Sequence, residues 1–333
     1  MKEAGIIDAL ARHLDGTGMP QGWTGIGDDA AVTAVPAGER TLTTVDVLVE
    51  DVHFRRASSS AADIAWKAMA VNVSDIRAMG GKPLWAVLGL SLPSDLEAGW
   101  CEAFAAGLGT ASRHFGLPVV GGDTTRSPGP IVVSLTLVGS TSRPMLRSTA
   151  RPGDRIVASG AFGWAAAGLW CLEHPESRIP EALRRRAESA QRRPEPATLP
   201  PFMVDLPHLA LMDDSDGLSA SLVTLAEASG VALVARDEAL DGDRDLETLA
   251  AHAGVPVRTW QLGGGEDYGL VACVPPGSSL PPGWRDLGQV EAGRGAWLAS
   301  AEGRRRLRFR GWDHFPTDHP RPRHSGDRDR SAP

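Results

Sequence analysis

Six short segments, spread along most of the chain, combine glycine or hydroxyl residues with carboxylates, and a fold of this chain has to accommodate all of them. Clustered carboxylates without matching bases indicate hard cations with oxygen ligands, and Mg²⁺ in such sites usually acts on phosphates. The pattern therefore favours a fold in which distant segments meet around cations. The six segments are GIGDDAAV from Gly25, TTVDVLVEDVHF from Thr43, the Lys67–Asp75 stretch, VVGGDTTRS from Val119, MDDSDGLSASL from Met212 and GGGEDYGL from Gly263.

The acidic excess of the chain is concentrated in these motifs. The net charge is −7, and without ten of the motif acids the chain would be net positive. No basic stripe is present outside Arg184–Arg193, so nucleic acid is not expected as a partner. The ten acids are Asp28, Asp29, Asp46, Asp75, Asp123, Asp213, Asp214, Asp216, Glu266 and Asp267.

Length and composition predict a two-domain protein of the cytoplasm. A chain of 333 residues with 42% hydrophobic content is long and apolar enough for two buried cores. Its three cysteines stand far apart without a CxxC pair, which argues against a zinc knuckle or a disulfide framework and fits a reducing compartment. The amphipathic N-terminus lacks the apolar run of a signal peptide, and no stretch is long enough to span a membrane.

The hydrophobic pattern predicts an N-terminal α/β domain. Strands are expected at 41–49, 84–92, 117–121 and 131–140, and helices at 60–79, where Ser60 caps the start, and at 95–115. The order β–α–β–α–β–β places the helices on one face of a sheet. A turn at Arg151 sets the domain boundary near 148, so the predicted division is 1–148 and 149–316, followed by a disordered tail at 317–333.

The second half is also expected to combine strands and helices in an α/β domain. A strand, RIVASG, follows the turn, and helices are expected from Gly163 and over 217–229. A polar stretch rich in arginine and proline lies between them, at 173–201. The predicted architecture is therefore α/β of the α+β type in both halves.

Each motif also has an ordinary structural interpretation. Thr44, Asp46 and Leu48 share one face of a strand, and an acid in an apolar strand is costly to bury without a cation, although an edge strand in water needs none. Asn72 and Asp75 are neighbours on a helix face and suit a hydrated Mg²⁺, although Asp75 is equally a surface acid of a late helical turn.

The glycine-rich motifs leave the same choice open. Gly121 and Gly122 permit a turn whose free N–H groups cradle phosphate, or an ordinary β-turn. Three acids in DDSDG exceed what one helix N-cap needs, and GGGEDY is consistent with a tight turn. No Walker loop, Ser–His–Asp set or activated cysteine competes with a cation site.

The motifs occur in an order that resembles the thiamine-monophosphate kinase family, over about residues 1–316. The matching segments are GIGDD at Gly25, VHF at His53, KAMAVNVSDIRAMGGKP from Lys67, GGDTTRS at Gly121, RSTARPGD at Arg147, SDGL at Ser215, GGEDY at Gly264 and GWDHF at Gly311.

This resemblance implies a two-domain fold like that of aminoimidazole ribonucleotide synthetase, in a homodimer whose N-terminal sheets pair into a barrel. It implies ATP, several Mg²⁺ ions, and phosphorylation of thiamine monophosphate to thiamine diphosphate. It makes Asp46, Asp75 and Asp123 the catalytic acids. The implied metal ligands are Asp29, Thr44, Asp46, Asp75, Asp123, Asp213 and Asp216. The implied nucleotide contacts are Gly121, Gly122, Arg147 and Ser215, and the implied substrate contacts are His53, Glu266 and Trp312.

Two positions depart from the family pattern. Val45 stands where a hydroxyl residue usually precedes the strand acid, so a metal contact has to come from Thr44, water or phosphate. Gly269 stands where glutamate usually follows the tyrosine, with little expected effect. Only Val45 favours a non-catalytic nucleotide- and metal-binding descendant.

Other ATP-using members of the superfamily are the remaining alternatives. An aminoimidazole ribonucleotide synthetase activates an amide oxygen with ATP. A selenophosphate synthetase needs a reactive cysteine before the first glycine motif, where this chain has none before Cys101. The hydrogenase-maturation relative ends in a cysteine, whereas this sequence ends Ser-Ala-Pro.

Overall fold

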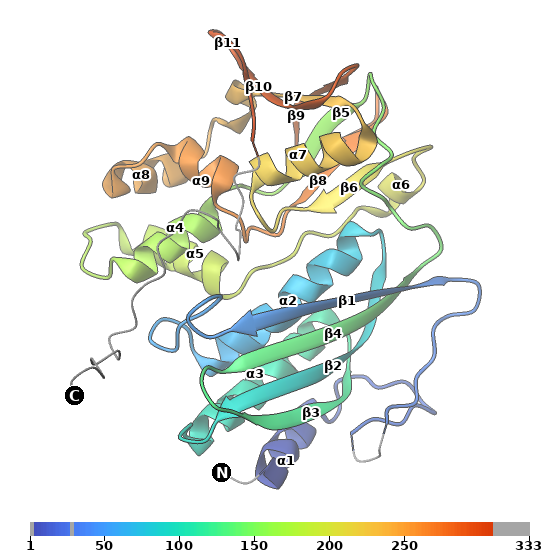
Figure 1. Cartoon of the computed structure of the whole chain (residues 1–333), viewed down its shortest axis with the longest axis vertical. Coiled ribbons are helices and arrows are strands. Elements are labelled where there is room, and N and C mark those ends of the chain that lie inside the picture. Colours follow the sequence, from blue (N-terminus) through green and yellow to red (C-terminus); the bar gives the residue numbers. More distant parts are fainter. Residues whose placement is uncertain (1–2, 27–29, 309–333) are drawn as a thin grey trace, which may run out of the picture.

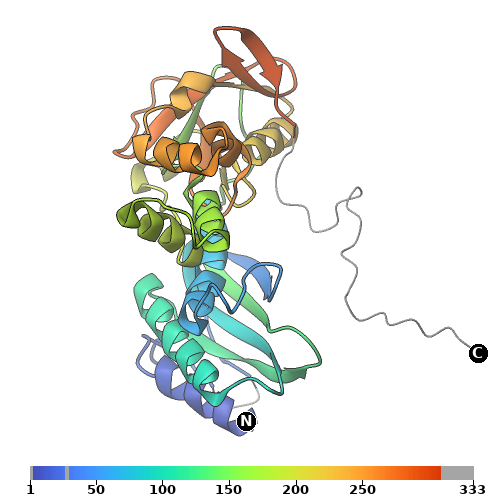
Figure 2. The same ribbon diagram turned by 90° about the vertical axis from the view of Figure 1, so that its left-hand side faces the viewer.

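The computed structural model describes residues 3–26 and 30–308, and these form two α/β halves, each built on its own sheet (Figure 1). Figure 2 shows the two sheets at opposite ends of a long molecule. The N-terminal half contains α1 (Glu3–Leu14), β1 (Arg40–Val49), α2 (Ala61–Ala78), β2 (Lys82–Pro93), α3 (Ala98–Phe115), β3 (Val119–Ser127) and β4 (Val132–Thr141).

The C-terminal half begins after a connecting segment that contains Arg147. Its strands are β5 (Arg155–Ser159), β6 (Ala210–Asp213), β7 (Ala232–Arg236), β8 (Leu270–Val274), β9 (Trp284–Glu291), β10 (Gly295–Ser300) and β11 (Gly303–Arg306). Its helices are α4 (Trp164–Glu173), α5 (Glu181–Arg192), α6 (Pro201–Val204), α7 (Leu218–Ser229), the 3-10 helix η1 (Asp237–Leu240), α8 (Arg244–Ala253) and α9 (Val257–Gly263).

The four-stranded sheet of the N-terminal half has the order β1-β4-β2-β3, so β1 and β3 are its two outer strands. Strands β1, β4 and β2 run antiparallel in turn, and β3 lies parallel to β2. Helices α2 and α3 cover one face of the sheet (Figure 1). Leu88, Leu135 and Phe104 belong to the buried apolar core of this half. The predicted strands, helices and one-sided cover are confirmed.

The start of α2 matches the sequence prediction closely. Ser60 accepts a hydrogen bond from the Asp63 backbone N–H, and the Asp63 side chain accepts one from the Ser60 backbone, which completes a capping box. The last turn gives way to Gly80, whose φ of +68° suits a residue without a Cβ. These signals fix both ends of the helix that carries Lys67 and Asp75.

One local expectation was wrong, and one helix was not predicted. The turn expected at Gly121 and Gly122 does not form, because β3 continues through both glycines to Ser127. The polar stretch at 173–201 contains α5, which packs against α4 where Gly168 lies so close to Ala187 that a Cβ would meet the Ala187 carbonyl oxygen at 2.0 Å. The core-facing side of this helix is reduced to Leu183, Ala187 and Ala190, and the many polar residues around them hid their helical spacing in the sequence.

A shared apolar cluster joins the two halves. Ala78 and Met145 from the N-terminal side pack with Val157, Leu211 and Leu270 of the seven-stranded sheet. That sheet has the order β11-β10-β7-β9-β5-β8-β6, which puts β6 at the edge nearest α2. None of the helices within 3–26 and 30–308 is long and apolar enough to cross a membrane.

Candidate active site

Three carboxylates from distant parts of the chain lie close enough to affect one another's ionisation. They are Asp46 on β1, Asp75 in α2 and Asp213 at the end of β6. Burial, and after it the charge of Asp75, raises the pKa of Asp46 to about 6. Burial, followed by the charges of Asp75 and Asp46, raises the pKa of Asp213 to about 7. Three of the predicted metal ligands thus form one acidic cluster that includes both halves.

Hydroxyl groups and one arginine surround this cluster. Thr44 Oγ1 donates a hydrogen bond to Asp75 Oδ2 at 2.5 Å, and Ser74 Oγ donates one to Asp213 Oδ2 at 2.9 Å. The positive charge of Arg147 acts to lower the pKa of Asp75 and of Asp213, although burial dominates and both values stay raised. Arg147, a predicted nucleotide contact, therefore lies near these acids.

Val45 lies on the other face of β1. Side chains alternate along a strand, so Thr44 and Asp46 share the side that faces α2, and Val45 points away from it. The contact between Thr44 and Asp75 and the 57% exposure of Val45 agree with this geometry. The valine therefore changes nothing on the face that carries the acids, which removes the only sequence argument for a non-catalytic descendant.

The donor set fits a hard cation that keeps part of its coordination for other ligands. In residues 3–26 and 30–308, no group of three or more acidic, histidine or cysteine side chains closes around a single point as a complete metal cage. Mg²⁺ usually takes one or two carboxylates and fills its other positions with water and phosphate oxygens. Carboxylates and hydroxyls spaced as in this cluster suit that mode of binding. Asp29 lies outside the described residues.

A cleft of about 550 Å³ lies beside the acidic cluster, between the two halves. Its lining combines predicted site residues with an apolar wall, as small-molecule sites usually do. The apolar wall includes Val52, Phe54, Leu169 and Leu172. The polar lining includes Asp46, His53, Lys67, Ser215, Asp216 and Glu266. Five of these six were predicted as site residues, and Trp312 lies outside the described residues.

Backbone groups hold the His53 side chain and the Glu266 main chain in this cleft. The Val49 N–H donates to His53 Nδ1 at 3.0 Å, so the neutral imidazole carries its proton on Nε2. The Glu266 N–H donates to the Ser215 carbonyl oxygen at 2.7 Å, which ties the GGEDY loop to the DDSDG segment. Glu266 has a φ of +58°, an uncommon left-handed conformation for a residue with a side chain.

The remaining acids of these two motifs support the fold. Asp267 accepts hydrogen bonds from the Gly163 and Ala165 N–H groups and so caps the start of α4. Asp214 is fully buried and accepts a hydrogen bond from Ser221 Oγ at 2.6 Å. The sequence did not distinguish these structural acids from the acids that line the cleft.

The GGDTTRS motif lies at the far edge of the N-terminal sheet. Two strands separate β3 from β1, so Asp123 and Asp46 are roughly 14 Å apart at the usual spacing of strands. Asp123 and Gly122 are exposed there. A Cβ on Gly122 would meet the Leu88 carbonyl oxygen at 1.9 Å, whereas one on Gly121 would meet nothing closer than 3.9 Å. Position 122 must therefore be glycine, because any side chain would clash with the backbone of β2. Gly121 has no such neighbour, which leaves room for a ligand close to the backbone.

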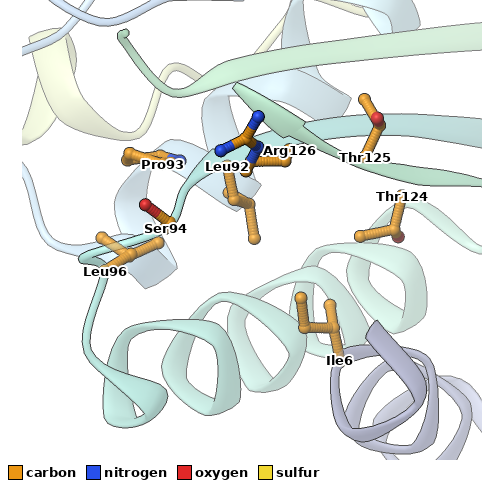
Figure 3. Close-up of a pocket in the computed structure, with 8 residues that line it drawn as sticks. All are labelled: Ile6, Leu92, Pro93, Ser94, Leu96, Thr124, Thr125 and Arg126. Atoms are coloured by element: carbon orange, nitrogen blue, oxygen red, sulfur yellow. The ribbon is translucent and has the colours of Figure 1, made fainter. Parts of the chain in front are cut away.

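A second cavity, of about 200 Å³, lies beside the end of this motif (Figure 3). Figure 3 shows Ile6 of α1 and Leu92 of β2 on its walls, with Arg126 above them. Thr124 and Thr125 complete the polar lining from β3. This cavity is separate from the cleft between the halves, so within one chain the GGDTTRS motif borders different space from the acidic cluster.

Some residues of the site were not predicted from the sequence. Ser74 contacts Asp213, and Gln191 contacts Glu266, in each case from a helix that lies far from its partner in the sequence. A serine within α2 and a glutamine within a very polar helix give no sequence signal for these roles. Leu169, on α4, forms part of the apolar wall of the cleft. The sequence of α4 indicates an ordinary apolar helix and does not mark this leucine as a cleft residue.

The raised pKa values predict that stability falls as pH rises. Burial raises the pKa of Asp267 to about 7, and Asp46 and Asp213 are raised to about 6 and about 7, from 3.8 in the unfolded chain. An acid with a higher pKa in the folded state stabilises the fold fully below its unfolded pKa and loses this contribution as pH rises through the folded pKa. We expect the free energy of unfolding of the ligand-free protein to drop by roughly a few kcal/mol between about pH 4 and pH 8. Urea titrations across that range measure it, and a constant or rising value would contradict the electrostatics described above.

Comparison with known proteins shows which protein family the chain belongs to. Residues 27–141 match the family described as AIR synthase related protein, N-terminal domain. The N-terminal half is thus a domain of the AIR synthase class. The relative from Mycobacterium tuberculosis (strain ATCC 25618 / H37Rv), a thiamine-monophosphate kinase, is 37% identical over 326 residues, covering 94% of this chain and 91% of that protein. The chain belongs to the thiamine-monophosphate kinase family.

Solved structures agree with this assignment over almost the whole chain. The thiamine-monophosphate kinase of Stenotrophomonas maltophilia K279a superimposes with a TM-score of 0.77 at 31% identity, covering 90% of this chain and 96% of that one. AaThiL, complexed with AMPPCP and TMP, superimposes with a TM-score of 0.76 at 34% identity, covering 94% and 97%. The mixed α/β fold predicted from the sequence is therefore confirmed.

Proposed function

We propose that this protein transfers the γ-phosphoryl group of ATP to thiamine monophosphate and so forms thiamine diphosphate. The observation that carries the proposal is the acidic cluster of Asp46, Asp75 and Asp213, which both halves form at the edge of a ligand-sized cleft. The AaThiL complex with AMPPCP and TMP supports it, because that relative binds a nucleotide analogue and the phosphorylated substrate together.

The chemistry needs positioning and charge compensation more than it needs a base. The acceptor is a phosphate oxygen that is already anionic, so no strong base has to activate it. Two unit charges about 4 Å apart repel by about 4 kcal/mol at an effective dielectric of about 20, and each phosphate carries more than one charge. Bound Mg²⁺ would supply the neutralisation of this charge. Asp46, Asp75 and Asp213 would hold it, with Asp29, Asp123, Thr44 and Asp216 as further ligands.

The other cleft residues then orient the two substrates. Arg147 adds a fixed positive charge beside the acids and compensates part of the triphosphate charge. Ser215 lies where the DDSDG segment meets the cleft, on the nucleotide side of the site. His53 and Glu266 contact thiamine monophosphate, and Trp312 is the predicted aromatic contact for its cationic rings. Transfer proceeds directly, without a covalent enzyme intermediate.

A coupled assay for ADP release tests this function. We expect ADP formation with ATP, Mg²⁺ and thiamine monophosphate, and none when unphosphorylated thiamine replaces the monophosphate, because the acceptor is its phosphate. Removal of Mg²⁺ with a chelator is expected to stop turnover. Nucleotide binding without ADP release under all of these conditions would contradict the proposal.

The proposal includes a cytoplasmic homodimer of two-domain subunits divided near residue 148. One face of the N-terminal sheet is open, and Val45 and Val47 expose 57% and 45% of their surface there. Neighbouring apolar side chains exposed on an open sheet face are typical of an interaction surface. Pairing of this face and of the outer strands β1 and β3 with a second copy would close the two sheets into a shared barrel. It would also bring the GGDTTRS motif of one copy to the acidic cluster of the other, so Asp123, Gly121 and Gly122 join the site.

A further inference from the structure

Lys67 is an unusual residue in this chain. Of the 34 basic residues only three are lysines, at positions 2, 67 and 82, and all others are arginines. Lys67 lies in α2 with only 5% of its side chain exposed, and its Nζ donates to Glu266 Oε1 at 2.8 Å. A buried ammonium group is costly unless a carboxylate compensates it. The lysine is therefore matched to Glu266, which belongs to the other half of the molecule.

Glu266 is held on its other side as well. Gln191 Nε2, from α5, donates to Glu266 Oε2 at 2.7 Å, and the Gln191 side chain is itself buried. The Glu266 backbone is fixed in a left-handed conformation by the contact with Ser215. The carboxylate nonetheless keeps 31% of its side chain exposed and lines the cleft. Each half of the protein thus holds one oxygen of the Glu266 carboxylate, Lys67 holding Oε1 and Gln191 holding Oε2, while the carboxylate stays accessible to a ligand.

We propose that Lys67 and Gln191 are positioning residues, which aim the Glu266 carboxylate at the thiamine moiety of the substrate. This inference rests on the proposed function. Lys67 and Asp75 lie eight residues apart in the same helix, a rise of about 12 Å. Helix α2 therefore acts as a rigid spacer between the acidic cluster and Glu266. Through its contact with Glu266, Lys67 fixes the distance between the acidic cluster and the GGEDY loop of the other half. This distance determines where the thiamine ring lies relative to the phosphates.

The first experiment replaces Lys67 by methionine, which keeps length and removes the charge. We expect kcat/KM for thiamine monophosphate to fall about tenfold to a hundredfold, since misplacement by about 1 Å has an effect of that order. The loss appears in KM for thiamine monophosphate, and KM for ATP stays at its wild-type value. Lys67→Arg restores part of the activity, because a guanidinium keeps the charge with a bulkier head. Lys82→Met, at an exposed lysine at the start of β2, is the matched control and retains wild-type kinetics.

Two further measurements separate positioning from simple structural damage. In a Glu266→Gln background the additional effect of Lys67→Met shrinks, because the carboxylate that it orients is gone. Amide hydrogen exchange at 263–269 in the ligand-free protein rises in Lys67→Met and not in Lys82→Met. Should Lys67→Met not fold, Gln191→Leu, which removes the other contact of Glu266, is tested with the same readouts.

Specific outcomes overturn the inference. A folded Lys67→Met protein with wild-type kcat/KM for thiamine monophosphate does so, and so does exchange at 263–269 that matches the wild type. A wild-type protein that releases no ADP with thiamine monophosphate overturns the proposed function instead. The exchange measurement needs no turnover, so it still decides whether Lys67 holds the loop.

Discussion

Asp75→Asn is expected to lower kcat for thiamine monophosphate phosphorylation on the order of a thousandfold while the protein stays folded. Asp75 is the member of the acidic cluster whose negative charge raises the pKa of both Asp46 and Asp213, so its charge acts on both of the other acids. An asparagine oxygen still accepts the hydrogen bond from Thr44, and the shape of the side chain is kept. The substitution therefore removes one negative charge and little else.

The thermal stability of the Asp75→Asn variant provides a second test of the prediction. Removing one of three neighbouring carboxylates relieves their repulsion in the ligand-free protein, so Tm is expected to stay the same or rise, and the pKa values of Asp46 and Asp213 are expected to fall. Stability then depends less on pH. Differential scanning calorimetry across the pH range and initial rates measure both effects. Asp95→Asn, at an exposed acid between β2 and α3, is the matched control. A folded Asp75→Asn protein with wild-type kcat would remove the acidic cluster from the mechanism.

The sequence predicts the fold best where local signals agree. The strand at 41–49 and the helix after Ser60 were predicted within a few residues, because alternation, capping and glycine stops all point the same way. Helix α5 was not predicted, because its apolar side is reduced to Leu183, Ala187 and Ala190 within a stretch rich in arginine and proline. Its close packing against Gly168 of α4 is a contact with another element, which leaves no pattern within the segment itself.

The candidate site shows the same division. The sequence indicated that Asp46, Asp75 and Asp213 are acids that need compensation, and the structure brings these three together. The position of Asp123 depended on strand order, which a motif does not contain: β3 follows β2 in the chain and pairs with it, and so lies at the edge opposite β1. The contacts of Lys67 and Gln191 with Glu266 join segments 199 and 75 residues apart, beyond the reach of any local pattern.

The separation of Asp123 from Asp46 makes the proposed dimer testable through activity. If the partner's Asp123 completes each site, a dimer of one Asp46→Asn subunit and one Asp123→Asn subunit has both changes in one site and none in the other. Each variant alone is expected to be inactive. The mixed dimer, purified through a different affinity tag on each subunit, is then expected to show about half of the wild-type activity.

A second mixed dimer distinguishes sites shared between two chains from sites built within one chain. Asp46 and Asp75 belong to the acidic cluster of a single chain, so a dimer of Asp46→Asn and Asp75→Asn subunits has one change in each site and stays inactive. If Asp123 instead acted within its own chain, both mixed dimers would be inactive alike. A monomeric protein would yield no doubly tagged species. Restored activity in the first mixed dimer and none in the second requires that acids from two chains act on the same phosphates.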